Sequence, residues 1–152
     1  MAGDETPGSG VIKYLGSYTY QLDDKGRVSL PAAFRRGATE QRFVLVQAYP
    51  PALALYPESE WVGVEERLRD LLRHQPSSRP YVLSVVAGAV EVVPDGQGRI
   101  LIPQRLKEAA NLDGQTLLVG AIDKIEIWNP SDFEAALEGA SEFAAYAPQI
   151  FR

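Results

Sequence analysis

The sequence reads DDKGRVSLP at residues 23–31 and DGQGRILIP at residues 95–103, so one short motif occurs twice, 72 residues apart. In each copy an aspartate opens a tight turn, and a glycine three residues later occupies the position where a short hairpin connection needs a positive φ. An arginine follows that glycine, three strand-type residues come next, and a proline begins a helical segment. The turn-forming residues predicted in this way are Asp23, Gly26, Asp95 and Gly98.

The similarity between the two halves continues beyond the turns at the same separation. Leu45 corresponds to Leu117 and Trp61 to Phe133, and apolar character is matched more often than identity. A fixed separation kept over roughly forty-five positions indicates a duplicated supersecondary unit. Each copy reads as strand, strand, helix, strand, strand, helix. We therefore expect an α+β fold, mainly β, of two tandem ββαββα repeats packed as one pseudo-symmetric pair.

Composition divides the chain into the two repeats, a connection and two tails. Residues 1–14 are rich in glycine and small polar residues and are expected to form a mobile tail. Repeat 1 covers residues 15–73, and repeat 2 covers residues 88–146. Residues 74–87 between them begin with HQPSSRP, which predicts a linker, and residues 147–152 form a C-terminal tail.

Two longer amphipathic helices are predicted, one near the end of each repeat. The first covers residues 58–73 and carries Trp61 on its apolar stripe. The second begins at Ser131, where Glu134 completes a capping box, and carries Phe133. These aromatic side chains could dock a partner, but packing into the core is the more ordinary role for them and is the one we favour.

Composition and charge limit the class of protein. The 152 residues are 45% apolar and include no cysteine, which excludes a disulfide framework and thiolate metal sites. No apolar run reaches membrane-spanning length and no secretion signal is visible, so we expect a cytoplasmic protein. The net charge is −5, yet residues 89–146 carry ten acidic against four basic side chains, while charges balance in repeat 1. Any basic surface therefore belongs to the first repeat.

Nothing in the sequence points to catalysis. The single histidine, His74, lies at a helix end, where a solvated role is expected. There is no Ser, His and Asp set, no metal-ligand spacing, no phosphate-binding loop and no dinucleotide fingerprint. We therefore expect neither an enzyme nor a bound metal or cofactor.

Basic side chains collect around the two turns. An arginine fork binds phosphate or a guanine edge with two hydrogen bonds, so a turn followed by basic residues can present a surface to nucleic acid. The opposing interpretation is that each Asp and Arg only clamp a hairpin, but a surface ion pair of that kind contributes little. We favour ligand contact. The residues predicted to bind DNA are Lys25, Arg27, Arg35, Arg36 and Arg99.

These motifs resemble those of the bacterial MraZ proteins, tandem members of the AbrB/SpoVT class of swapped-hairpin DNA-binding proteins. The resemblance covers residues 14–143. Besides both turns it includes GSY at 16–18, FR at 34–35, AGA at 87–89, LVG at 118–120 and IW at 127–128.

The resemblance implies that the repeats form one swapped-hairpin, double-psi-like β-barrel with flanking helices, and that subunits assemble into a homo-oligomeric ring. It also implies a nucleoid-associated transcriptional regulator of the division and cell-wall gene cluster, which binds direct repeats of double-stranded DNA in its own promoter. Gln97 replaces Lys25 in the second copy, which is acidic, so we assign DNA contact mainly to repeat 1 and scaffold contact to repeat 2. A protein-assembly or partner-binding module of the same fold, without DNA, is the alternative.

Overall fold

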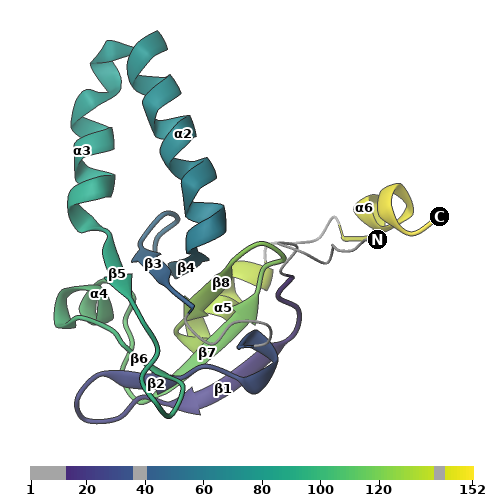
Figure 1. Cartoon of the computed structure of the whole chain (residues 1–152). Coiled ribbons are helices and arrows are strands. Elements are labelled where there is room, and N and C mark those ends of the chain that lie inside the picture. Colours follow the sequence, from purple (N-terminus) through teal and green to yellow (C-terminus); the bar gives the residue numbers. More distant parts are fainter. Residues whose placement is uncertain (1–12, 36–40, 139–142) are drawn as a thin grey trace, which may run out of the picture.

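The computed structural model describes residues 13–35, 41–138 and 143–152 (Figure 1). Most of the predicted N-terminal tail, and Arg36 among the predicted DNA-binding residues, lie outside these described residues. The strands within them are β1 (Ser17–Gln21), β2 (Arg27–Ser29), β3 (Phe43–Val46), β4 (Leu53–Pro57), β5 (Val90–Val92), β6 (Arg99–Leu101), β7 (Gln115–Gly120) and β8 (Ile125–Trp128). The helices are η1 (Ala32–Phe34), α2 (Glu58–His74), η2 (Pro76–Ser78), α3 (Arg79–Gly88), α4 (Gln104–Ala109), α5 (Pro130–Glu138) and α6 (Phe143–Ile150).

The described strands form an open sheet and a separate ribbon. The antiparallel sheet has six strands in the order β1-β7-β8-β4-β3-β5, while β2 and β6 pair with each other. Its edge strands β1 and β5 each lead into an Asp-Gly turn, after which the chain leaves the sheet for the ribbon. Because β2 and β6 do not join these edges, the described residues form no closed barrel, and the barrel prediction is wrong in this respect. The fold is α+β with a mainly antiparallel sheet.

The pairings follow a pseudo-twofold axis that relates the two repeats. Val28 pairs with its own counterpart Ile100 in the ribbon. In the sheet, β1 pairs with β7 as β5 pairs with β3, and β4 pairs with β8 across the axis. Among the described strands only β3–β4 and β7–β8 pair within one repeat. Residues of both repeats therefore build one shared core.

The correspondence between repeats shifts by one residue in β7. Tyr18 pairs with Leu118, whereas its counterpart Val90 pairs with Leu45. Leu45 is thus equivalent to Leu118 and not to Leu117, as the constant separation had predicted. Leu45 and Leu118 are fully buried, while Leu117 is half-buried on the other face. One extra residue between β6 and β7 accounts for the shift, because a strand moved by one position presents its other face.

Both faces of the sheet are covered at β3, which explains its uninterrupted apolar sequence FVLV. On the inner face, Leu45 packs in the main core with Val28 and Ile100 from the ribbon. On the outer face, Val44 packs with Trp61 of α2 in a second, smaller cluster. Trp61 is therefore a packing residue, as favoured from the sequence. Its counterpart Phe133 is half-buried, with its ring 5.4 Å from that of Trp128.

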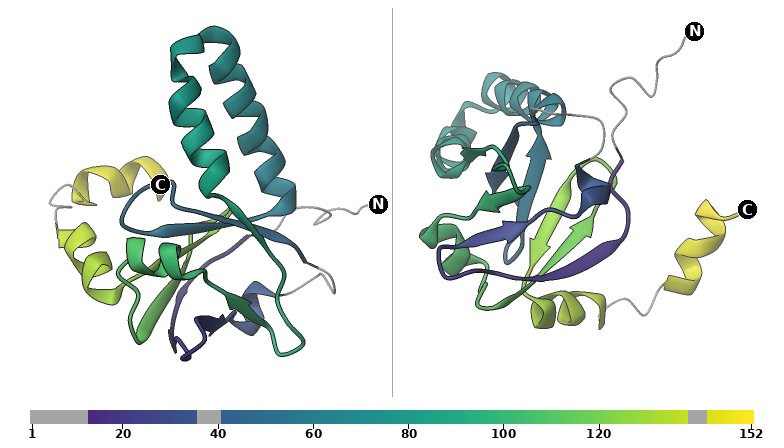
Figure 2. Two further views of the ribbon diagram at one scale, coloured as in Figure 1. Left: turned by 90° about the vertical axis from the view of Figure 1, so that its left-hand side faces the viewer. Right: turned by 60° about the horizontal axis from the view of Figure 1, so that its bottom comes forward.

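The segment between the repeats is helical. Residues 74–87, the predicted linker, include the end of α2, all of η2 and most of α3. Pro76 and Pro80 occupy first-turn positions of η2 and α3, where a missing N–H costs no helical hydrogen bond. Figure 2 shows the resulting α2–α3 hairpin standing away from the sheet.

The last predicted helix is present as α5 and α6, with residues 139–142 between them outside the described part of the chain. The side chain of Asn129 caps α5, since its Oδ1 accepts the N–H groups of Ser131 and Asp132 at 2.8 and 3.1 Å. The predicted capping residue, Ser131, instead lies inside the first turn. Within the described residues, no helix is both long enough and apolar enough to cross a membrane.

Candidate nucleic-acid interface

The first turn is closed by the side chain that opens it. Gly26 has a φ of +87°, and its N–H donates to the carbonyl of Asp23 at 3.0 Å. The Asp23 carboxylate accepts the N–H groups of Lys25 and Arg27 on Oδ1, at 2.9 and 2.8 Å. Its Oδ2 accepts Nε–H of Arg27 at 2.8 Å. The aspartate therefore fixes both the turn and the arginine that follows it.

The second turn repeats this arrangement. Gly98 has a φ of +76°, and Asp95 accepts the N–H groups of Gln97 and Arg99 at 2.9 and 3.0 Å. Nε–H of Arg99 donates to Oδ2 of Asp95 at 3.0 Å. The Asp–Arg ion pair, which the sequence analysis considered as a clamp of each hairpin, thus exists in both turns. Each clamp occupies Nε of its arginine, and the described residues provide no hydrogen-bond partner for the Nη groups of Arg27 or Arg99.

The hydrogen bonds at the turns lower the pKa of both carboxylates. The pKa of Asp23 lies below its ordinary value, chiefly because the backbone N–H of Arg27 donates to the carboxylate, and to a smaller extent through the Arg27 side chain and the Lys25 N–H. Asp95 has a lowered pKa as well, with the Arg99 backbone N–H as the main cause. Hydrogen bonds to the charged form of a carboxylate favour that form.

The ribbon places the two arginines on one exposed face. Val28 and Ile100 point into the core, so their neighbours at positions 27, 29, 99 and 101 lie on the opposite side. The side chains of Arg27 and Arg99 are 30% and 28% exposed. They occupy diagonal positions across the two strands, which corresponds to a separation of roughly 7–8 Å. The ribbon therefore presents a pair of arginines to solvent.

Each turn is also tied to the strand of the other repeat. The N–H of Leu30 donates to the carbonyl of Gly98 at 2.9 Å, and the N–H of Ile102 donates to the carbonyl of Gly26 at 2.8 Å. Both turns are thus fixed to one ribbon, so their relative position is set by backbone hydrogen bonds.

Arg35 comes from the first repeat, but its side chain lies against the second turn. Its Nε–H donates to the carbonyl of Leu30 at 3.1 Å. Its guanidinium lies directly over Gly98, where an added Cβ would come within 2.8 Å of Cζ. Lys25 is exposed at the tip of the first turn. The structure thus brings Lys25, Arg27, Arg35 and Arg99 to the two turns and their ribbon, whereas Arg36 lies outside the described residues.

Ser29 and Leu101 complete this face and were missed in the sequence analysis. Ser29 pairs with Arg99, and Leu101 pairs with Arg27 and is 54% exposed. Strict alternation with the buried residues of each strand would have identified them. We call the outer face of β2 and β6 with its two turns the ribbon face. Its residues are Lys25, Arg27, Ser29, Arg35, Arg99 and Leu101.

The ribbon face is only weakly basic. Its four cations lie beside the carboxylates of Asp23, Asp24 and Asp95, so the local excess of positive charge is small. The described residues contain no cluster of acidic and histidine side chains able to hold a metal ion. The chemistry available here is therefore hydrogen bonding and charge pairing by arginine and lysine.

Comparison with known proteins identifies the family. The family model for the MraZ protein matches residues 14–81 and 85–149. A "Transcriptional regulator MraZ" from Desulfitobacterium hafniense (strain Y51) is 39% identical over 135 residues, which is 87% of this chain and 94% of the relative. Proteins of the same name from Desulforamulus reducens and Pediococcus pentosaceus are both 36% identical, over 80% and 85% of this chain and 84% and 90% of their own lengths. With two matched repeats and relatives aligned over most of its length, the chain belongs to the MraZ family.

Proposed function

We propose that this protein is a DNA-binding transcriptional regulator that reads direct repeats in its own promoter through the ribbon face. The names of its relatives are those of regulators and not of enzymes. The observation that carries the proposal is the pair of arginines, Arg27 and Arg99, held on the outer face of a two-stranded ribbon. The major groove of DNA admits such a ribbon, and arginine is the side chain that most often reads guanine there.

The clamp and the ligand contact are compatible in this geometry. Asp23 engages Nε of Arg27, which orients the guanidinium and leaves its Nη groups available for phosphate oxygens or a guanine edge. A side chain that is already ordered loses less conformational entropy when it binds. Lys25 and Arg35 are then suited to phosphate contact beside the two reading arginines.

Because the ribbon face is only weakly basic, tight binding to DNA requires several subunits. Each neutralised phosphate adds only about 0.9 to the salt dependence of the binding constant, so one subunit with net charge −5 binds DNA weakly. A ring of subunits converts later contacts into intramolecular steps and selects DNA that carries repeated sites. We therefore retain the ring, the direct repeats upstream of the division and cell-wall genes, and a nucleoid location as parts of the proposal.

A gel-shift assay tests the function. The probe is the DNA upstream of the protein's own gene, and the assay is run at two salt concentrations with wild type, Arg27→Ala and Arg99→Ala. We expect a repeat-dependent, salt-sensitive complex that Arg27→Ala abolishes and Arg99→Ala weakens. Lys13→Ala, an exposed cation away from the ribbon face, is the matched control. Promoter binding by Arg27→Ala at wild-type strength would contradict the proposal.

A further inference from the structure

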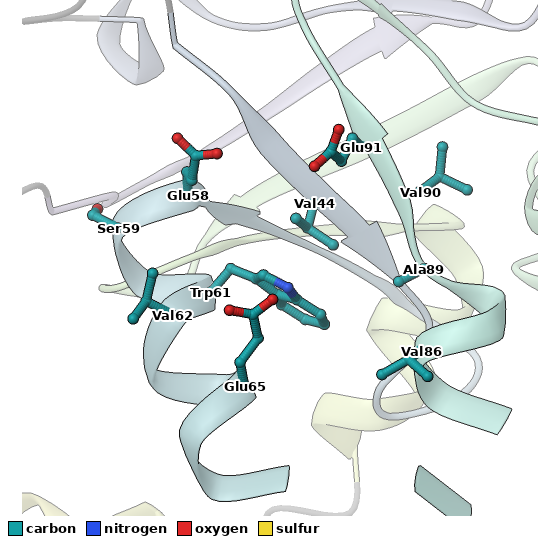
Figure 3. A pocket seen from close by; sticks show the side chains of 10 residues that line it. All are labelled: Val44, Glu58, Ser59, Trp61, Val62, Glu65, Val86, Ala89, Val90 and Glu91. Atoms are coloured by element: carbon teal, nitrogen blue, oxygen red, sulfur yellow. The ribbon is translucent and has the colours of Figure 1, made fainter. Parts of the chain in front are cut away.

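The base of the α2–α3 hairpin holds an apolar groove. The groove has a volume of about 620 Å³, with Val44 and Trp61 at its floor and Val62 of α2 and Val86 of α3 on its walls (Figure 3). Val62 and Val86 are 53% and 45% exposed. The described residues of the chain therefore leave this apolar surface open to solvent.

The charges around the groove are of one sign. Its charged lining residues are the three glutamates Glu58, Glu65 and Glu91, and among the described residues no lysine or arginine lines it. Glu58 and Glu65 come from α2, while Glu91 comes from β5 on the other side (Figure 3). A suitable occupant is therefore apolar and carries basic but no acidic side chains.

The segment at residues 143–152 has this character. It contains no Asp or Glu, and its one charged side chain is Arg152. Phe143, Ile150 and Phe151 are 60%, 70% and 82% exposed. Phe143 and Ile150 lie seven residues apart on one stripe of α6, in the pattern that helices use when they bind in grooves, and Phe151 directly follows the helix.

Helix α6 is short and exposed. It has eight residues, none of them buried. Isolated helices shorter than roughly 12–15 residues are marginal in water, because nucleation is costly and few hydrogen bonds follow it. In Figure 1 and in the right-hand view of Figure 2, α6 lies apart from the α2–α3 hairpin of its own chain.

We propose that α6 of one copy, together with the two residues that follow it, docks in the α2–α3 groove of the next copy, with Phe143, Ile150 and Phe151 on the apolar floor and Arg152 near the glutamates. This inference rests on the ring assembly in the proposed function and gives that assembly an interface. A helix at one place and a groove at another make a head-to-tail contact, which closes into a ring when the rotation between subunits allows it.

Cysteine crosslinking tests the docking directly, since the natural chain has no cysteine. Val62→Cys in a chain carrying a size tag is mixed with untagged Ile150→Cys and oxidised. We expect a crosslinked band of mixed size. The matched control replaces Val62→Cys by Thr19→Cys, an exposed position on β1, and yields no such band. Absence of the mixed band overturns the proposal, as does a doubly substituted chain that crosslinks only within itself.

The mass of the assembly in solution gives a second test, in which one variant changes the helix and another changes the groove. We expect Ile150→Asp and Val62→Lys each to reduce the assembly to single chains of 16.7 kDa, with the wild-type circular dichroism spectrum retained. The matched control is Leu83→Asp, a 45% exposed apolar residue on α3 that does not line the groove, which leaves the mass unchanged.

The failures of the two proposals can be told apart. Wild type that assembles, with docking variants that also assemble, overturns the docking and leaves the ring. A monomeric wild type overturns both docking and ring, while the gel-shift reports separately on DNA binding. Wild type that assembles through α6 but ignores its promoter overturns the regulator and leaves the docking.

Discussion

At the scale of single residues, each turn is built around one carboxylate that accepts three N–H groups. Asp23 binds the backbone of Lys25 and Arg27 and the side chain of Arg27, and Asp95 does the same in the second repeat. One short side chain thereby shapes the turn and orients the arginine. This dual role explains why Asp and Arg recur at the same spacing in both copies.

The lowered pKa values of Asp23 and Asp95 predict an acid-sensitive stability. A carboxylate whose pKa is lowered by folding stabilises the fold above its ordinary value of 3.8, and this contribution is lost as the pH falls through the folded-state value. We expect the double variant Asp23→Asn, Asp95→Asn to be less stable than wild type at pH 7, with the difference shrinking below pH 3.8. Urea unfolding of both proteins between pH 7 and pH 3 measures this. A difference that stays constant over that range would contradict it.

Arg27→Ala should separate binding from stability. The Arg27–Asp23 pair is partly exposed, and such pairs contribute little to folding. We expect thermal melting to fall by no more than about 4 °C while promoter binding is lost. Arg69→Ala, which removes an exposed ion pair on α2, is the control for the stability effect. A much larger fall in melting temperature would show that the arginine serves mainly as a clamp.

At the scale of elements, the end of β7 requires a glycine because neighbouring backbone approaches it too closely for a side chain. A positive φ is not the reason. The N–H of Gly120 donates to the carbonyl of Gly16 at 2.7 Å, and a Cβ on Gly120 would lie 2.4 Å from the carbonyl carbon of Tyr14. We expect Gly120→Ala to cost at least about 1–3 kcal/mol, because backbone must move. Gly96→Ala is the control, since nothing lies within 4 Å of that site. Urea unfolding compares them, and equal stabilities would rule out the close approach.

The elements also show which structural features local sequence patterns can predict and which they cannot. Pro31 and Pro103 precede η1 and α4, as predicted from the proline after each short strand, because that signal is local. Strand partners were not predictable in this way, because β1 and β2 pair with strands of the other repeat and not with each other. The charges of the ribbon face were visible in the sequence, whereas the position of Arg35 over Gly98 depends on the exchange of strands between repeats.

At the scale of the whole molecule, the repeats depend on each other for their pairing. Without repeat 2, β1 loses β7, β2 loses β6 and β4 loses β8. We therefore expect a fragment of residues 1–87 to form no folded monomer, although it contains a complete repeat. Circular dichroism and light scattering measure this, with the full chain as control. A folded monomeric fragment would show that the repeats are independent domains.

The proposed ring predicts how steeply the DNA-binding constant falls with salt concentration. The ribbon face of one subunit has four cations among its described residues, and each phosphate contact contributes about 0.9 to the slope of log K against log salt, so one subunit gives a slope of at most about 4. Subunits of one assembly that bind successive repeats add their slopes and gain affinity from proximity. We expect DNA with three repeats to show about three times the slope of DNA with one. Fluorescence anisotropy over a salt series measures both, with the double variant Arg27→Ala, Arg99→Ala as control. Equal slopes for the two DNAs would mean that a single subunit makes the contact, and the argument from the weak charge of the ribbon face would fail.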